Sequence, residues 1–99
     1  MKDEKVIIYE LDKIIQRLNK DELGPKQAMH EIAHLILPAE GMAFMEENKD
    51  KMPLEELARA ASKIGSKGYS TEMWRSIVLA LTAIQEANTR LKNRIDDPK

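Results

Sequence analysis

Two histidines stand four residues apart in this chain, in the stretch His30-Glu31-Ile32-Ala33-His34. Residues at this spacing lie on one face of a helix, so both imidazoles can reach a single zinc ion. Glu31 follows the first histidine, and a carboxylate in this position can take a proton from a metal-bound water. The pattern predicts metal ligands at His30 and His34 and, when metal is bound, a catalytic base at Glu31.

These five residues resemble the zinc-binding helix of the zincin metalloproteases, and the resemblance ends with them. It implies a zinc-dependent hydrolase whose third metal ligand lies elsewhere in the chain. The metzincin branch would need a glycine and a third histidine where this chain has Leu37 and Glu40. A downstream glutamate could serve instead, and the candidates are Glu46, Glu47, Glu55 and Glu56. Zincins also hold substrate along the edge of a sheet, for which this sequence offers no strand.

Composition favours a small helical domain. The chain has 99 residues, 42% hydrophobic and 33% charged, with four aromatic residues and no cysteine. Without cysteine, disulfides, thiolate catalysis and Cys-ligated metal sites are excluded. The apolar runs, such as 6–9 and 77–81, are too short for a signal peptide or a membrane span. We therefore expect one cytoplasmic domain over residues 1–99 with no membrane contact.

Apolar residues recur with helical spacing along most of the chain, which predicts an all-α fold. The fold class we expect is a single compact, antiparallel bundle of four to five helices with a long C-terminal helix. Residues 1–3 and 96–99 should fray at its ends. The predicted helices cover about residues 3–20, 25–37, 39–48, 53–64 and 71–95.

Turn residues mark the ends of these helices. Pro25 suits the first position of the second helix, whose polar side carries the two histidines, away from its apolar stripe. Gly65 suits a left-handed stop after the fourth helix, and Ser70 suits the N-cap of the fifth. The histidines should therefore be surface residues. The simpler interpretation is that they bind nothing, so we expect no cofactor, with zinc as the alternative.

The last predicted helix carries a heptad pattern of apolar residues. Its seam consists of Trp74, Ile77, Leu81, Ile84, Asn88, Leu91 and Ile95. Asn88 is the polar member of this seam, where an asparagine can set register or partner choice, although it can equally be a half-exposed edge residue. The length of the helix and its seam favour a protein–protein contact. We expect an interface at Asn88, Leu91 and Ile95, with a protein partner or a second copy of the chain.

Charge is unevenly distributed along the chain. Residues 1–50 carry 7 Lys+Arg and 11 Asp+Glu, a net charge of −4, whereas residues 51–99 carry 9 and 6, a net charge of +3. Residues 54–78 make helix, turn and helix, and Glu56-Leu57-Ala58 resembles the start of helix-turn-helix DNA-binding units. Nucleic-acid binding is therefore a second alternative, after zinc hydrolysis, to the expected non-enzymatic protein contact.

Overall fold

Five helices account for the regular structure in the part of the chain that the structure describes. The computed structural model describes residues 3–65 and 68–96, and for residues 94–96 it describes the backbone alone. The helices are α1 (Glu4–Asn19), α2 (Pro25–Ile36), α3 (Ala39–Asn48), α4 (Leu54–Gly65) and α5 (Thr71–Asp96). No strand occurs in these two described ranges. The all-α bundle with a long C-terminal helix is confirmed, and each predicted end lies within one residue of the observed one.

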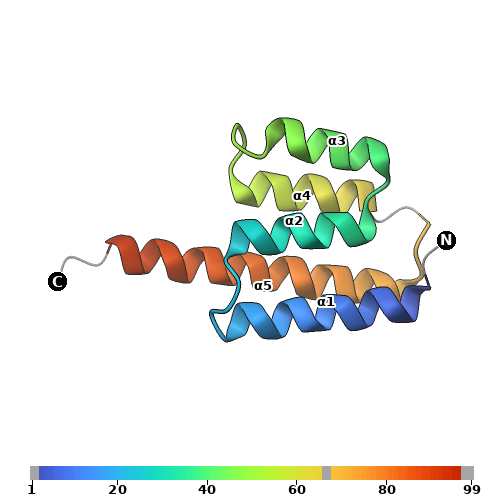
Figure 1. The fold of residues 1–99 in the computed structure, drawn as a ribbon, viewed down its shortest axis with the longest axis horizontal. Helices are drawn as coiled ribbons and strands as arrows, with labels where there is room; N and C mark the ends of the chain where they lie inside the picture. The colour runs from blue at the N-terminus through green and yellow to red at the C-terminus, as the bar shows by residue number, and fades with distance from the viewer. Residues whose placement is uncertain (1–2, 66–67, 97–99) are drawn as a thin grey trace.

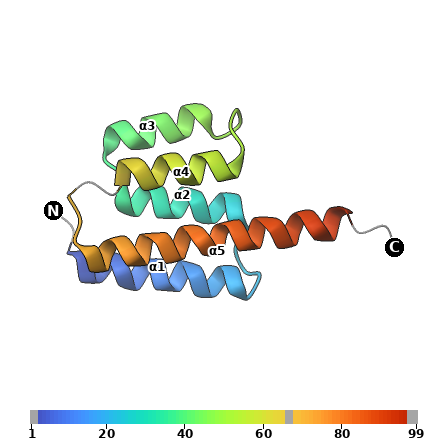
Figure 2. The ribbon, with the colours of Figure 1, turned by 180° about the vertical axis from the view of Figure 1, so that it is seen from behind.

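The helices pack in two overlapping groups (Figures 1 and 2). The first group is α1, α2 and α5, and the second is α2, α3 and α4, with α4 also against α5. Consecutive helices run antiparallel, as predicted, but α1 and α5 run in the same direction (Figure 1). With five helices that reverse at each turn, the first and the last must point the same way. The expected fraying at residues 1–2 and 97–99 lies outside the described residues.

The core forms from the apolar stripes of the helices. On α1 the buried residues are Ile7, Leu11, Ile14 and Leu18, which step by four, three and four. Small side chains on the inner faces of the other helices let their backbones approach, and these are Ala28, Ala33, Ala58, Ala61 and Ala80. Among the described residues, no helix combines the length and the apolar character that crossing a membrane requires.

The start of α5 is tied to α1 and α2. Ser70 Oγ accepts a hydrogen bond from the Met73 backbone N–H at 3.2 Å, which confirms Ser70 as the N-cap of α5. The same hydroxyl donates to Glu4 Oε1 at 2.5 Å, and the Tyr69 hydroxyl donates to the Ile36 backbone oxygen at 3.0 Å. We call Glu4, Tyr69 and Ser70 the N-terminal clasp. Through Glu4, the clasp places the first turns of α1 and α5 side by side.

Gly65 plays a different part from the one that its sequence context predicts. The prediction of a left-handed helix stop is wrong, because Gly65 is the last residue of α4 and the described glycine with positive φ is Gly68, at 84°. A Cβ atom on Gly65 would lie 2.9 Å from Ile36 Cδ1. The missing side chain therefore lets the end of α4 pack closely against α2, and this contact is invisible in the local sequence.

The C-terminal part of α5 projects beyond the other helices (Figures 1 and 2). The helix has 26 residues and α1 has 16, and the two begin side by side, so about ten residues of α5 pass the end of α1. Ten helical residues span about 15 Å. Leu23, from the α1–α2 connection, and Pro25, the first residue of α2, lie beside Ala87 and Leu91 at the base of this projection. We call residues 88–96 the α5 extension.

Candidate functional site

His30 and His34 lie on the exposed side of α2, one turn apart. Ile32 and Ala33, on the opposite side of the helix, are fully buried. The two histidine rings meet edge to face, with centroids 4.5 Å apart and an interplanar angle of 81°. Their Nε2 atoms are 3.1 Å apart, so one Nε2–H can donate a hydrogen bond to the other Nε2. The helix therefore aims two potential metal ligands at one point.

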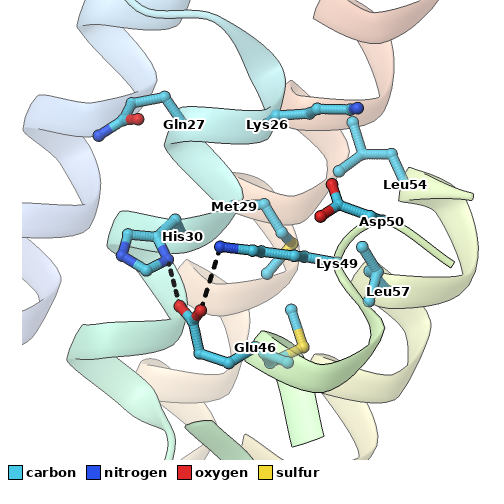
Figure 3. Close-up of a pocket in the computed structure, with 10 residues that line it drawn as sticks. Lys26, Gln27, Met29, His30, Glu46, Lys49, Asp50, Leu54 and Leu57 are labelled. Carbon is cyan, nitrogen blue, oxygen red and sulfur yellow. Dashed lines mark ion pairs between the residues drawn. The ribbon is translucent and has the colours of Figure 1, made fainter. Parts of the chain in front are cut away.

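Of the four candidate glutamates, Glu46 on α3 is the one whose carboxylate contacts a histidine (Figure 3). Its Oε1 atom lies 3.5 Å from His30 Nδ1, and its Oε2 atom lies 3.2 Å from Lys49 Nζ. The hydrogen bond from Lys49 and the charge of that lysine lower the pKa of Glu46, with smaller contributions from His30 and His34. Glu46 is therefore a carboxylate at neutral pH, held beside the imidazole of His30.

The nitrogen of His30 that Glu46 contacts determines whether Glu46 could share a metal ion with the two histidines. The carboxylate approaches Nδ1 of His30, whereas the two histidines face each other through Nε2. These two nitrogens point away from each other across the ring, so one ion between the Nε2 atoms would not touch Glu46 in this arrangement. Within the described ranges, no group of three or more His, Cys, Asp or Glu side chains is placed to hold a metal ion.

Glu31 contacts a different part of the molecule. Its Oε1 atom accepts a hydrogen bond from Arg17 Nη1 on α1 at 3.1 Å, and both side chains are partly exposed. The motif is thus divided between two neighbours, because its histidine His30 contacts α3 while Glu31 contacts α1. The sequence does not indicate Arg17 as the partner of Glu31, since nothing in the local pattern relates Arg17 to the motif. The role of Glu31 as a catalytic base stays a prediction.

A cavity of about 290 Å³ lies beside His30, between α2, α3 and α4 (Figure 3). Its apolar lining comes from Met29, Met45, Leu54 and Leu57. Charged and polar residues of both signs surround it, namely Lys26, Gln27, His30, Glu46, Lys49 and Asp50. Nothing in the sequence pattern indicates this cavity, because residues of three separate helices form it.

The other predicted sites are spread over the bundle. Leu91 is 42% exposed and Asn88 is half-buried, whereas the side chain of Ile95 lies outside the described residues. Of the basic residues within 54–78, the range that suggested nucleic-acid binding, Arg59 and Lys63 are exposed on α4, and Lys67 is not described. In both views α4 and α5 run along nearly parallel lines, with α2 drawn between them, rather than crossing steeply as in a helix-turn-helix unit (Figures 1 and 2).

Two regions carry features that the fold alone does not require. One is the group of His30, His34 and Glu46, and the other is the α5 extension. No protein-family model, no curated protein and no solved structure matches this chain.

Proposed function

We propose that this protein acts through protein–protein contact and that the α5 extension joins two copies of the chain. The observation that carries the proposal is the continuation of one apolar seam from the core into solvent. Ile77 and Ile84 have no exposed surface, whereas Leu91, on the same seam, is 42% exposed. The seam keeps its heptad spacing where the bundle no longer covers it, as expected of a helix that packs against a partner.

Burial of Leu91 alone would not hold two molecules together. Complete burial of a leucine side chain contributes about 1.5–3 kcal/mol, and Leu91 is already partly covered. A specific interface commonly buries about 800 Å² on each partner, more than one face of a 15 Å helix provides. Both extensions must therefore take part, each against the body of the other copy. This reciprocal arrangement is two-fold symmetric and closes at a dimer.

The charge distribution favours a second copy as the partner. Arg90 and Lys92 are exposed on the extension, while residues 1–50, which form α1 to α3, carry a net charge of −4. Pairing of two extensions side by side would bring their basic residues together. Packing of each extension against the acidic half of the other copy instead joins opposite charges. We therefore expect the dimer to weaken as salt screens these charges.

Sedimentation equilibrium of the wild-type chain and of Leu91→Glu tests the proposal. The chain mass is 11.3 kDa, so the wild type should approach twice that value with increasing concentration, and Leu91→Glu should remain near 11.3 kDa. Asn93→Glu is the matched control, because it adds the same charge on the opposite face of the extension and should still dimerise. Circular dichroism of both variants should match that of the wild type, since residues 91 and 93 are exposed.

Two results would contradict this assignment. A wild-type chain that sediments as a monomer up to millimolar concentration would refute self-association. A wild-type dimer that Leu91→Glu leaves intact would show that two copies meet through another surface.

A further inference from the structure

We propose, independently of self-association, that His30 and His34 bind one divalent transition-metal ion through their Nε2 atoms, with Glu46 as the positioning residue for His30. The site therefore differs from a catalytic zinc centre with three protein ligands. It has two imidazole ligands from one helix and a carboxylate from a second helix that orients one of them.

The distance between the two nitrogens fits a shared ion. Zinc binds histidine nitrogen at about 2.0–2.1 Å, so two such nitrogens around a tetrahedral ion lie about 3.3 Å apart. The Nε2 atoms of His30 and His34 are 3.1 Å apart. Both side chains extend from the same face of α2, four residues apart, so one helix places both nitrogens within reach of one ion. The shared hydrogen lies near the line between the two nitrogens, whereas a tetrahedral ion lies off that line. Both exposed rings would therefore turn to direct their lone pairs at the ion, while the distance between the nitrogens changes by a few tenths of an ångström.

Glu46 gives His30 the tautomer that metal binding requires. A carboxylate beside Nδ1 favours the form that carries its proton on that nitrogen, which leaves the lone pair of Nε2 for the ion. Glu46 Oε1 lies 3.5 Å from His30 Nδ1, which is an electrostatic contact that places the carboxylate on this side of the ring. Lys49 Nζ lies 3.2 Å from the other carboxylate oxygen and holds Glu46 in place. Carboxylate–histidine–metal arrangements of this kind are common around metal ligands in proteins.

The ligand set selects the class of ion. Imidazole nitrogen suits zinc, nickel and copper, whereas magnesium and calcium prefer oxygen ligands. The His30 side chain is 44% exposed, so water can occupy the remaining coordination positions. We therefore expect one zinc or nickel ion per chain, bound reversibly and in contact with solvent.

Isothermal titration calorimetry with zinc, on the chain without an affinity tag, tests the proposal. The wild type should bind one zinc ion, magnesium should give no binding heat, and His34→Ala should abolish zinc binding. Glu46→Gln should weaken zinc binding by about 10- to 100-fold, the usual effect of removing a partner that orients a ligand. Glu47→Gln is the matched control, because this exposed neighbour on α3 should leave the affinity unchanged.

Histidine side-chain NMR provides a readout that a purely structural role would not change. Zinc should shift the Nε2 resonances of both histidines, and His30 should carry its proton on Nδ1 in the wild type but less so in Glu46→Gln. Zinc affinity unchanged in His34→Ala, or no zinc binding by the wild type, would overturn the site. Equal zinc affinity of Glu46→Gln and Glu47→Gln would overturn the positioning role. Leu91→Glu should retain zinc binding, which separates this site from the proposed dimer.

Discussion

The two ends of α5 carry the same seam and have opposite surroundings. At its N-terminal end, Ser70 caps the helix and contacts Glu4, and Met73 and Ile77 have no exposed surface. At its C-terminal end the seam continues into solvent through Leu91. Heptad spacing therefore predicts which residues share a face, whereas the neighbouring helices determine whether that face is buried.

The difference follows from the lengths of the two parallel helices. The N-terminal clasp aligns the starts of α1 and α5, and α1 then ends about ten residues before α5. The start of α5 lies between α1, α2 and α4, whereas the α5 extension projects past the last turn of α1 and the first turns of α2 and α4 (Figure 1). The covered end should contribute to the stability of the fold, and the projecting end should contribute to association.

Truncation of seam residues at the two ends of α5 should reveal the largest difference in the free energy of unfolding. Ile77→Ala should lower the free energy of unfolding by about 2–5 kcal/mol, because it removes buried methyl groups and leaves a cavity. Leu91→Ala, the matched change at the projecting end, should alter the stability of the monomer by about 0.5 kcal/mol or less. Urea denaturation followed by circular dichroism, at a concentration too low for dimers, measures both. Equal losses of stability in the two variants would contradict the proposed difference between the two ends of α5.

Removal of the N-cap of α5, at its covered end, should lower the free energy of unfolding by a smaller amount. Ser70→Ala deletes the N-cap oxygen of α5 and the hydroxyl that contacts Glu4, so we expect a loss of about 1–2 kcal/mol. A double-mutant cycle with Glu4→Ala separates the two contributions, and positive coupling is expected if the clasp links α1 to α5. Strict additivity of the two substitutions would show that Ser70 acts through its cap alone.

The pH dependence of stability tests the third member of the clasp. Burial, and secondly the charge of Glu4, raise the pKa of Tyr69 above its ordinary value of 10.0. The unfolded chain then loses the phenol proton first, so stability is complete below about pH 10 and falls as pH rises through the raised pKa. Tyr69→Phe should cost about 1 kcal/mol at neutral pH through the lost bond to Ile36. It should also reduce the alkaline fall in stability.

Tyr9→Phe is the control for this measurement, because the Tyr9 side chain is 58% exposed on α1. This variant should keep both the neutral stability and the alkaline fall of the wild type. An alkaline fall that is the same in Tyr69→Phe and Tyr9→Phe would assign the effect to other groups.

The helices were predictable because their signals are local. The spacing of Ile7, Leu11, Ile14 and Leu18 predicts both α1 and its buried face. Pro25 marks the first turn of α2, and Ser70 marks the start of α5. Gly65 was misassigned because a glycine at a helix end serves equally as a turn residue or as a point of close packing. Only the position of Ile36 on α2 distinguishes the two.

The candidate site was predictable only in part, because only the positions of its two histidines depend on local helix geometry. His30 and His34 share a face because they are four residues apart, and this holds for any helix. Their sequence spacing did not select Glu46 from the four candidate glutamates, and it did not reveal that Glu31 pairs with Arg17. Those contacts depend on how α1 and α3 lie beside α2.

The sequence by itself therefore determined an all-α bundle of four to five helices, the helix bounds within one residue, and the faces that carry the apolar seams and the two histidines. These properties depend on the repeat of the helix and on residues at its ends. The tertiary structure alone decided which carboxylate meets His30, which helix engages Glu31, and where the seam of α5 loses its cover. These depend on the relative positions and lengths of helices that are distant along the chain.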